Sequence, residues 1–196
     1  ASDHLIDRND FENDLILVGV VGMMDPPRLE VKASIEEAKN AGISTIMITG
    51  DHKNTALSIA KELSIAQTMG EVISGIDLNL IAPEQFNDEV VKYKVFARVS
   101  PEHKVMIVKA FQEKGNIVSM TGDGVNDAPS LNAADIGVAM GITGTDVAKS
   151  ASDMILADDN FNTIVKAIEQ GRVIFGNIKK SVLFLLSSNL GEVVTM

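Results

Sequence analysis

Two carboxylates, an amide and two glycines are crowded into residues 121–129, Thr-Gly-Asp-Gly-Val-Asn-Asp-Ala-Pro. An apolar run at 117–120 predicts a buried strand before them, and residues 127–134 can begin a helix after them. In open α/β sheets, ligands bind at the carboxyl ends of the strands. Carboxylates on one turn repel each other unless a cation or a proton joins them. Because oxygen ligands suit Mg²⁺ bound together with phosphate oxygens, we predict a magnesium–phosphate site that contains Asp123 and Asp127.

Three other interpretations of this stretch are weaker. A surface turn also favours Gly, Asn and Asp, but here these residues directly follow a buried strand. A dinucleotide fingerprint would use Gly122 and Gly124, but Asp127 stands where its third glycine is required, and a carboxylate there would repel a pyrophosphate. An EF-hand loop fails because its later Gly and Glu are out of register.

The same strand–loop–helix order occurs earlier in the chain. A predicted buried strand at 43–48 runs into Thr49, Gly50 and Asp51, and a helix is expected from about residue 54 to 63. Local sequence alone favours Thr49 as a strand-end residue that caps the next helix. The recurrence of the pattern adds weight to the alternative that this loop contacts phosphate.

A third strand is predicted at 95–99, and Ser100 with Pro101 predicts the start of a helix that runs to about residue 114. Lys104 falls in the first turn of that helix, near the carboxyl edge of the sheet. A lysine on a helix is usually a solvated surface charge. Arg98, placed among apolar strand residues, is either a sheet-edge residue or a ligand contact.

The elements that must position these residues alternate between strand and helix, which predicts an α/β fold with a largely parallel sheet flanked by helices. Residues 65–93 offer no chemistry that we can identify. The remaining predicted elements are buried strands at 15–22, 136–140 and 154–156, a proline-bearing turn at 25–28, helices at 28–40, 83–91 and 145–152, and a short strand at 71–75.

Composition narrows the class of protein further. The chain has 196 residues, enough for one domain with a sizeable core. Its 17 basic and 27 acidic residues give a net charge of −10, which argues against nucleic acid as a partner. The absence of cysteine excludes disulfides and Cys-ligated zinc. The polar first fourteen residues do not resemble a signal peptide.

The C-terminal part differs in character from the rest. A helix is predicted at 160–180, and residues 181–196 are almost wholly apolar, with Glu192 as their only charge. These residues fall short of the ~20 needed to span a bilayer, and we expect the start of a transmembrane helix; the alternative is a buried core helix. A lone glutamate at membrane depth suggests a functional site. Asn189 shares its helical face and could join it in binding a cation.

Four motifs follow one another in the order found in P-type cation-transporting ATPases: Asp-Pro-Pro-Arg at 25–28, Thr-Gly-Asp at 49–51, Arg98 with Ser-Pro-Glu-His-Lys at 100–104, and residues 121–129. From residue 15 onward the chain resembles the second part of their phosphorylation domain, which belongs to the haloacid-dehalogenase superfamily. The resemblance is weakest at 65–93. It divides the chain into residues 1–159, the phosphorylation domain, and 160–196, a stalk leading into the fifth transmembrane helix.

The resemblance implies specific roles in ATP-driven transport. Asp123 would bind Mg²⁺ with support from Asp127, and Lys104 would offset phosphate charge. The expected phosphoryl contacts are Thr49 and Gly50, and the expected contacts to ATP are Asp51, Arg98 and Asn126. Residues 187–194 are similar to those of calcium pumps of the sarcoplasmic-reticulum type, which makes Ca²⁺ the expected cargo and Asn189 and Glu192 its ligands; sodium/potassium pumps tend to carry proline in place of Gly191.

The implied protein is a multi-pass membrane pump with this domain on the cytoplasmic side. Its partners would be the nucleotide-binding, actuator and transmembrane parts of the same pump. The family's Asp-Lys-Thr-Gly-Thr motif, whose Asp is phosphorylated, is absent from these 196 residues. In the family this motif lies upstream, on the central strand of the sheet, so we expect a gap in the core and no ATP hydrolysis by the chain alone.

Two alternatives to the pump remain from the residues themselves. One is a soluble phosphatase of the same superfamily whose last helix belongs to its core. The other is a receiver-like, Mg²⁺-binding regulatory domain, for which Asp51 is the only candidate phosphate acceptor. The full coding sequence separates them, because a pump requires further apolar spans and the upstream nucleophile.

Overall fold

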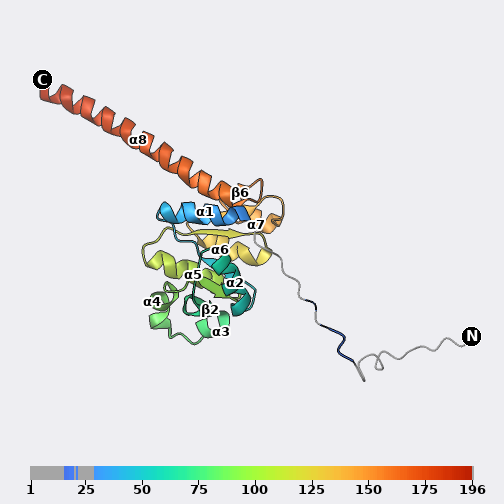
Figure 1. Ribbon diagram of the computed structural model, residues 1–196. Helices are drawn as coiled ribbons and strands as arrows, with labels where there is room; N and C mark the ends of the chain where they lie inside the picture. Colours follow the sequence, from blue (N-terminus) through green and yellow to red (C-terminus); the bar gives the residue numbers. More distant parts are fainter. Residues whose placement is uncertain (1–15, 20, 22–28, 196) are drawn as a thin grey trace, which may run out of the picture.

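The computed structural model describes residues 16–19, 21 and 29–195 (Figure 1). Helices surround two small sheets, and one long helix, α8, projects away from them. The elements follow the alternation that the sequence predicts. The helices are α1 (Leu29–Asn40), α2 (Lys53–Glu62), α3 (Gly75–Leu78), α4 (Phe86–Val90), α5 (Pro101–Glu113), α6 (Ala128–Ala133), α7 (Asp146–Ser150) and α8 (Phe161–Thr195), with 3₁₀ turns η2 (Met69–Glu71), η3 (Pro83–Gln85) and η4 (Val125–Asp127).

Each sheet has three strands, and every strand pair is parallel. The first sheet has the order β1-β3-β2 and the second has the order β4-β5-β6. Parallel pairing confirms the predicted α/β class. The strands of the first sheet are β1 (Met47–Thr49), β2 (Val72–Ser74) and β3 (Val95–Ala97), and those of the second are β4 (Ser119–Gly122), β5 (Ile136–Met140) and β6 (Met154–Leu156).

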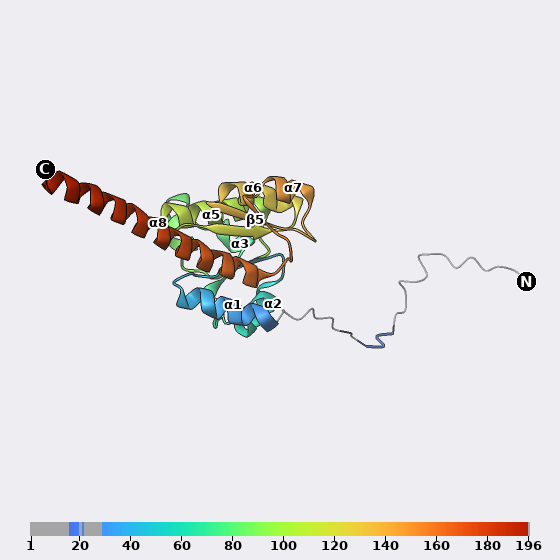
Figure 2. The same ribbon diagram turned by 90° about the horizontal axis from the view of Figure 1, so that it is seen from above.

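Successive side chains of the central strands β3 and β5 point to opposite faces of their sheets, which divides the core into layers. In β3, Val95 and Ala97 pack in the cluster that includes α2, whereas Phe96 packs with residues of α4 and α5. In β5, Val138 packs against α8 and Ala139 packs with α6 and α7. Successive strand side chains point to opposite faces, so both sheets are covered on two sides. Figure 2 shows α6 and α7 on one side of β5 and α8 with α1 on the other.

The strands β1 and β4 are edge strands within the described residues, since each pairs with one neighbour. All three residues of β3 are buried, whereas those of β1 are half-buried. Ile48 of β1 packs against the core clusters of both sheets, so β1 lies at their junction. The two sheets therefore share a core without a described strand that joins them.

Several predicted elements differ from the structure. Residues 16–19 and 21 form no strand and are exposed, so the predicted buried strand at 15–22 is wrong for the part that is described. An apolar run favours burial, but a strand also needs the edge of a neighbouring strand to pair with, and hydropathy does not show whether such an edge exists. The turn at 25–28 lies outside the described residues. Strand β1 begins only at Met47, and β4 begins at Ser119, which leaves Ile117 exposed.

Helix α8 is continuous over its 35 residues, and it contacts the domain mainly through its first turns. Ile164 and Val165 are buried, whereas most side chains from Gly171 onward are exposed. Arg172 Nη1 donates a hydrogen bond of 2.9 Å to the carbonyl of Ala41, just beyond α1. In the described part of the chain, no helix combines the length and apolarity that crossing a bilayer requires.

Candidate functional site

The turn after β4 is built around the carboxylate of Asp127. This side chain is buried, and its Oδ2 accepts hydrogen bonds from the backbone N–H groups of Asp123, at 3.2 Å, and Gly124, at 3.0 Å. A Cβ on Gly122 would lie 2.5 Å from Asp127 Cβ, so only glycine permits this approach. The backbone of this turn therefore binds the carboxylate of Asp127, whereas the side chain of Asp123 in the same turn is exposed.

The second oxygen of Asp127 binds the ammonium of Lys104. Ser100 caps α5 by accepting a hydrogen bond from the N–H of His103, and this helix start places Lys104 beside the turn. Lys104 Nζ lies 2.5 Å from Asp127 Oδ1, and the two side chains are 22% and 10% exposed. Burial acts to raise the pKa of Asp127, but the hydrogen bonds from Lys104 and Gly124 outweigh it and hold this pKa below its usual range.

The two aspartates differ in how far their carboxylate oxygens are engaged, and the predicted roles of Asp123 as metal ligand and Asp127 as its support stay predictions. Both oxygens of Asp127 are already engaged, whereas the exposed Asp123 carboxylate makes no hydrogen bond or ion pair to any described residue. Its backbone carbonyl accepts a hydrogen bond of 2.8 Å from Thr145 N–H. One open carboxylate fits Mg²⁺, which commonly completes its shell with water and phosphate oxygens. In the described residues, no three His, Cys, Asp or Glu side chains form a complete protein site for a metal ion.

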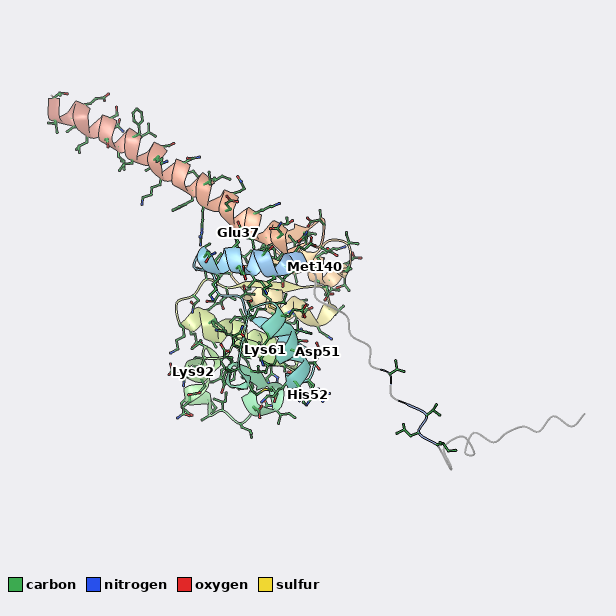
Figure 3. All side chains as sticks on the ribbon, in the orientation of Figure 1. Glu37, Asp51, His52, Lys61, Lys92 and Met140 are labelled. Atoms are coloured by element: carbon green, nitrogen blue, oxygen red, sulfur yellow. The ribbon has the colours of Figure 1, made fainter. Side chains whose placement is uncertain are left out.

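The loop after β1 forms a separate local unit. Thr49 Oγ1 donates to Asp51 Oδ2 at 2.9 Å and accepts from Asp51 N–H at 3.1 Å. The N-cap of α2 is His52, so the alternative in which Thr49 caps this helix is wrong. Figure 3 shows Asp51 on the same side of the domain as Met140, the last residue of β5. Gly50 is exposed between its two neighbours.

The structure brings together only some of the predicted site residues. Lys104, Asp123 and Asp127 form one connected group, whereas no hydrogen bond or ion pair in the described chain joins this group to Thr49 or Asp51. Arg98 and Asn126 are exposed. Arg98 follows β3 instead of lying within it, and its φ of 48° is unusual for a residue other than glycine. The combined phosphate site therefore remains a prediction.

Asn189 and Glu192 lie on α8, as the predicted helix requires, and both side chains are exposed. Residues 189 and 192 share one helical face because three positions span most of a turn. In the region that the structure describes, no group of three or more His, Cys, Asp or Glu side chains forms a metal site around them. Their role in cation binding stays a prediction.

Sequence reasoning missed a clamp formed by Asp159. This residue has φ 48°, and its carboxylate accepts hydrogen bonds from three consecutive backbone N–H groups, those of residues 141–143, at 2.6–3.0 Å. Thr143 Oγ1 adds a fourth, at 2.8 Å. These contacts, led by that of Ile142 N–H, outweigh burial and lower the pKa of Asp159 to about 2. The glycines at 141 and 144 signal a turn, but no local pattern connects it to an aspartate 16 to 18 residues further along the chain.

Comparisons with known proteins show which family the chain resembles. The description "haloacid dehalogenase-like hydrolase" belongs to the family model that matches residues 3–135. A calcium-transporting ATPase 1 of Bacillus cereus is 63% identical over 191 residues, which are 97% of this chain and 22% of that protein. A calcium-transporting ATPase of Bacillus subtilis is 56% identical over 94% of this chain and 21% of its own length. The chain therefore spans about a fifth of these relatives.

Two further matches extend the comparison. A P-type sodium-transporting ATPase4 of Toxoplasma gondii is 50% identical over 92% of this chain and 14% of its own length. The solved structure of the catalytic domain of a CPx-ATPase, CopB-B, is 31% identical, with a TM-score of 0.54, and the match covers 74% of this chain and 46% of that one. The relatives named for different ions show that close similarity in this region does not by itself specify the ion.

The first prediction concerns the Lys104–Asp127 pair. Asp127→Asn should lower the free energy of unfolding by about 1–3 kcal/mol, because it leaves the partly buried ammonium of Lys104 without a counter-ion. Urea unfolding of the 196-residue chain measures this. Asp123→Asn is the matched control on the same turn and should change stability by less than about 0.5 kcal/mol. Equal losses in the two variants would contradict the pairing.

The second prediction concerns pH. Because the pKa of Asp159 is lowered from 3.8 to about 2, its carboxylate stabilises the fold fully above pH 3.8 and loses this contribution as the pH falls toward 2. The melting temperature of Asp159→Asn should therefore lie below that of the unaltered chain at pH 6, and the difference should shrink toward pH 2. Thermal unfolding followed by circular dichroism tests this, and a difference that stays constant between pH 6 and 2 argues against the clamp.

Proposed function

Because the chain belongs to the haloacid dehalogenase-like hydrolases and, within them, to the P-type ATPases, we propose that it forms part of an ATP-driven pump that moves Ca²⁺ across a membrane. The calcium-transporting relatives favour this function over that of a soluble phosphatase. The single observation that supports it best is the contact of 2.5 Å between Lys104 and Asp127 beside the open carboxylate of Asp123. A fixed cation then lies beside the turn that carries a candidate metal ligand.

The chain's own residues would divide the work of phosphoryl transfer among them. Phosphoryl transfer depends mostly on positioning and on neutralising phosphate charge. The ammonium of Lys104 would offset that charge, while Asp127 holds both Lys104 and the turn in place. Mg²⁺, bound through Asp123, would supply the remaining positive charge. The hydroxyl of Thr49 and the backbone N–H of Gly50 would donate to phosphoryl oxygens, and Asp51, Arg98 and Asn126 would contact ATP.

The phosphorylated aspartate would come from a segment outside these 196 residues. We place its strand between β1 and β4, because each of these strands has one edge without a partner strand in the described chain. A parallel strand there would pair with both edges and join the two sheets into one. Its carboxyl end would bring the aspartate toward Thr49 on one side and toward Asp123 and Lys104 on the other. This arrangement explains why two groups of site residues are separate in this chain.

The membrane part of the proposal rests on α8. The domain of residues 1–159 would lie on the cytoplasmic side, and residues 160–196 would form a stalk that leads into a transmembrane helix. Asn189 and Glu192 would supply oxygen ligands to Ca²⁺ inside the membrane, where further ligands from other helices of the pump must join them. The nucleotide-binding, actuator and transmembrane parts of the same pump would be the partners of this domain.

The third prediction tests the pump directly. The full-length protein in membrane vesicles should form a phosphoenzyme from ATP when Ca²⁺ is present, and Na⁺ or Mn²⁺ should not replace Ca²⁺. Lys104→Ala and Asp123→Ala should each slow turnover on the order of 10²-fold, because each removes a fixed charge interaction at the phosphoryl group.

Lys61→Ala, which removes an exposed lysine of α2, is the control and should behave like the unaltered pump. Phosphoenzyme that depends on another ion would reassign the cargo. Absence of any phosphoenzyme in the unaltered protein would refute the pump, and normal turnover of Asp123→Ala would refute the magnesium role.

The fourth prediction is that the 196-residue chain alone hydrolyses no ATP, because it lacks the nucleophilic aspartate. Phosphate release by the purified chain should equal that of its Asp123→Ala variant at every Mg²⁺ concentration. Release that exceeds this background and disappears in Asp123→Ala would mean that the chain carries its own nucleophile or activates water directly.

A further inference from the structure

A short segment at 74–79, which we call the bridging segment, lies between two loops that are predicted to bind ATP. It contains α3 and the residues on either side of it, and the sequence alone assigns it no role. Asp77, in the middle of this segment, accepts a hydrogen bond of 2.6 Å at Oδ2 from Oγ of Ser74, its first residue, and the same Oδ2 lies 2.5 Å from Lys53 Nζ. Lys53 begins α2, two residues after Asp51. One end of the bridging segment is thus tied to the first loop.

The other end is tied to the second loop through His103. This imidazole is 9% exposed, and both of its nitrogens have partners. Nδ1 accepts the backbone N–H of Ser100 at 3.1 Å, and Nε2 lies 2.8 Å from Asn79 Oδ1. Because Nδ1 accepts, the ring proton must reside on Nε2, which donates to the amide oxygen of Asn79. The neutral form of His103 therefore links α5 to the bridging segment.

Close packing reinforces this link. A Cβ on Gly75 would lie 2.5 Å from the carbonyl oxygen of Arg98 and 3.1 Å from His103 Nδ1. The carbonyl of Arg98 and the imidazole of His103 therefore lie directly against the backbone of Gly75. Arg98 has φ 48°, a conformation that a residue other than glycine keeps only when its surroundings hold it. The carbonyl of Arg98 lies against Gly75, and His103 binds the N–H of Ser100 two residues later, so both contacts flank this conformation.

We propose that His103 is a positioning residue: its neutral imidazole fixes the loop at 98–100 against the bridging segment and so places Arg98 for nucleotide binding. The inference rests on the proposed function, in which Arg98 contacts ATP. Lys104 is adjacent in sequence but is held separately, by its pair with Asp127. Loss of the His103 link should therefore weaken nucleotide binding more than it slows the chemical step.

A purely structural explanation makes a different prediction. His103 completes a capping box at the start of α5, since it accepts from Ser100 N–H and donates its own N–H to Ser100 Oγ. If capping were its only role, the bond to Asn79 would not matter. Asn79 is exposed, so its substitution removes the link without opening a cavity and without touching the cap. Asn79 is therefore the residue that separates the two explanations.

The experiment measures the KM for ATP and the kcat of the full-length protein. His103→Phe and Asn79→Ala should each raise KM about three- to tenfold, the effect of one or two lost hydrogen bonds, with kcat within about twofold. The double variant should be no worse than His103→Phe, because both changes break one link. Asn79→Asp retains the acceptor oxygen and should keep KM within about twofold.

Val90→Ala is the matched control, because it removes buried volume from α4 and lowers stability without removing a hydrogen-bond partner of His103 or Asn79. It should leave KM unchanged. An unchanged KM in Asn79→Ala, or a fall in kcat equal to the rise in KM, would overturn the proposal. A loss of affinity in Val90→Ala as large as that in Asn79→Ala would also overturn it.

A second measurement keeps this inference separate from the pump. The ¹⁵N shifts of the His103 ring in the 196-residue chain should show a proton on Nε2 and none on Nδ1, and Asn79→Ala should speed hydrogen exchange at the Ser100 amide. If the unaltered protein forms no phosphoenzyme, the pump is refuted and these shifts still test the link. A proton on Nδ1 at neutral pH would refute the link even in an active pump.

Discussion

The burial of the Asp127 carboxylate is the constraint on which the rest of the candidate site depends. A buried carboxylate is tolerated only when its oxygens are satisfied, and here two backbone N–H groups and one ammonium satisfy them. Gly122 provides the space, and the start of α5 brings Lys104 to the required position. Asp123 remains unpaired within the described residues because its neighbour has taken the available donors. A single buried charge thus fixes a cation and leaves an open anion beside it.

The residues of the candidate site fall into two groups, one beside each sheet, just as the core falls into clusters around each sheet. The Asp127 turn follows β4 of the second sheet and binds Lys104 of α5, whereas Thr49 ends β1 of the first sheet and Asp51 lies in the loop that follows it. Exposed strand edges favour pairing with another strand, and β1 and β4 have such edges among the described residues. If a further parallel strand joins them, its carboxyl end meets residues from both sheets. The separation of the two residue groups is therefore what the proposed pump requires of this part of its chain.

Much of the fold could be predicted from the sequence, but contacts between distant residues could not. Hydrophobic runs and the Ser100-Pro101 cap located most strands and helices, and the strand–loop–helix order placed Lys104 and Asp123 at one edge. The same reasoning assigned a strand to 15–22, because apolarity does not reveal whether a partner edge exists. It assigned no role to 65–93, because the link between Asn79 and His103 joins residues 24 positions apart. Local patterns carry no information about such pairs.

Helix α8 and the Asp159 clamp have a mechanical consequence. Asp159 lies two residues before α8, and its carboxylate binds the N–H groups of the loop at 141–143. Two residues after this loop, the N–H of Thr145 donates a hydrogen bond to the carbonyl of Asp123. A helix of 35 residues is about 52 Å long, so a tilt of about 5° at its base moves its far end by about 4.5 Å. A small change in the angle at the start of α8 therefore becomes a displacement of several ångströms at its far end.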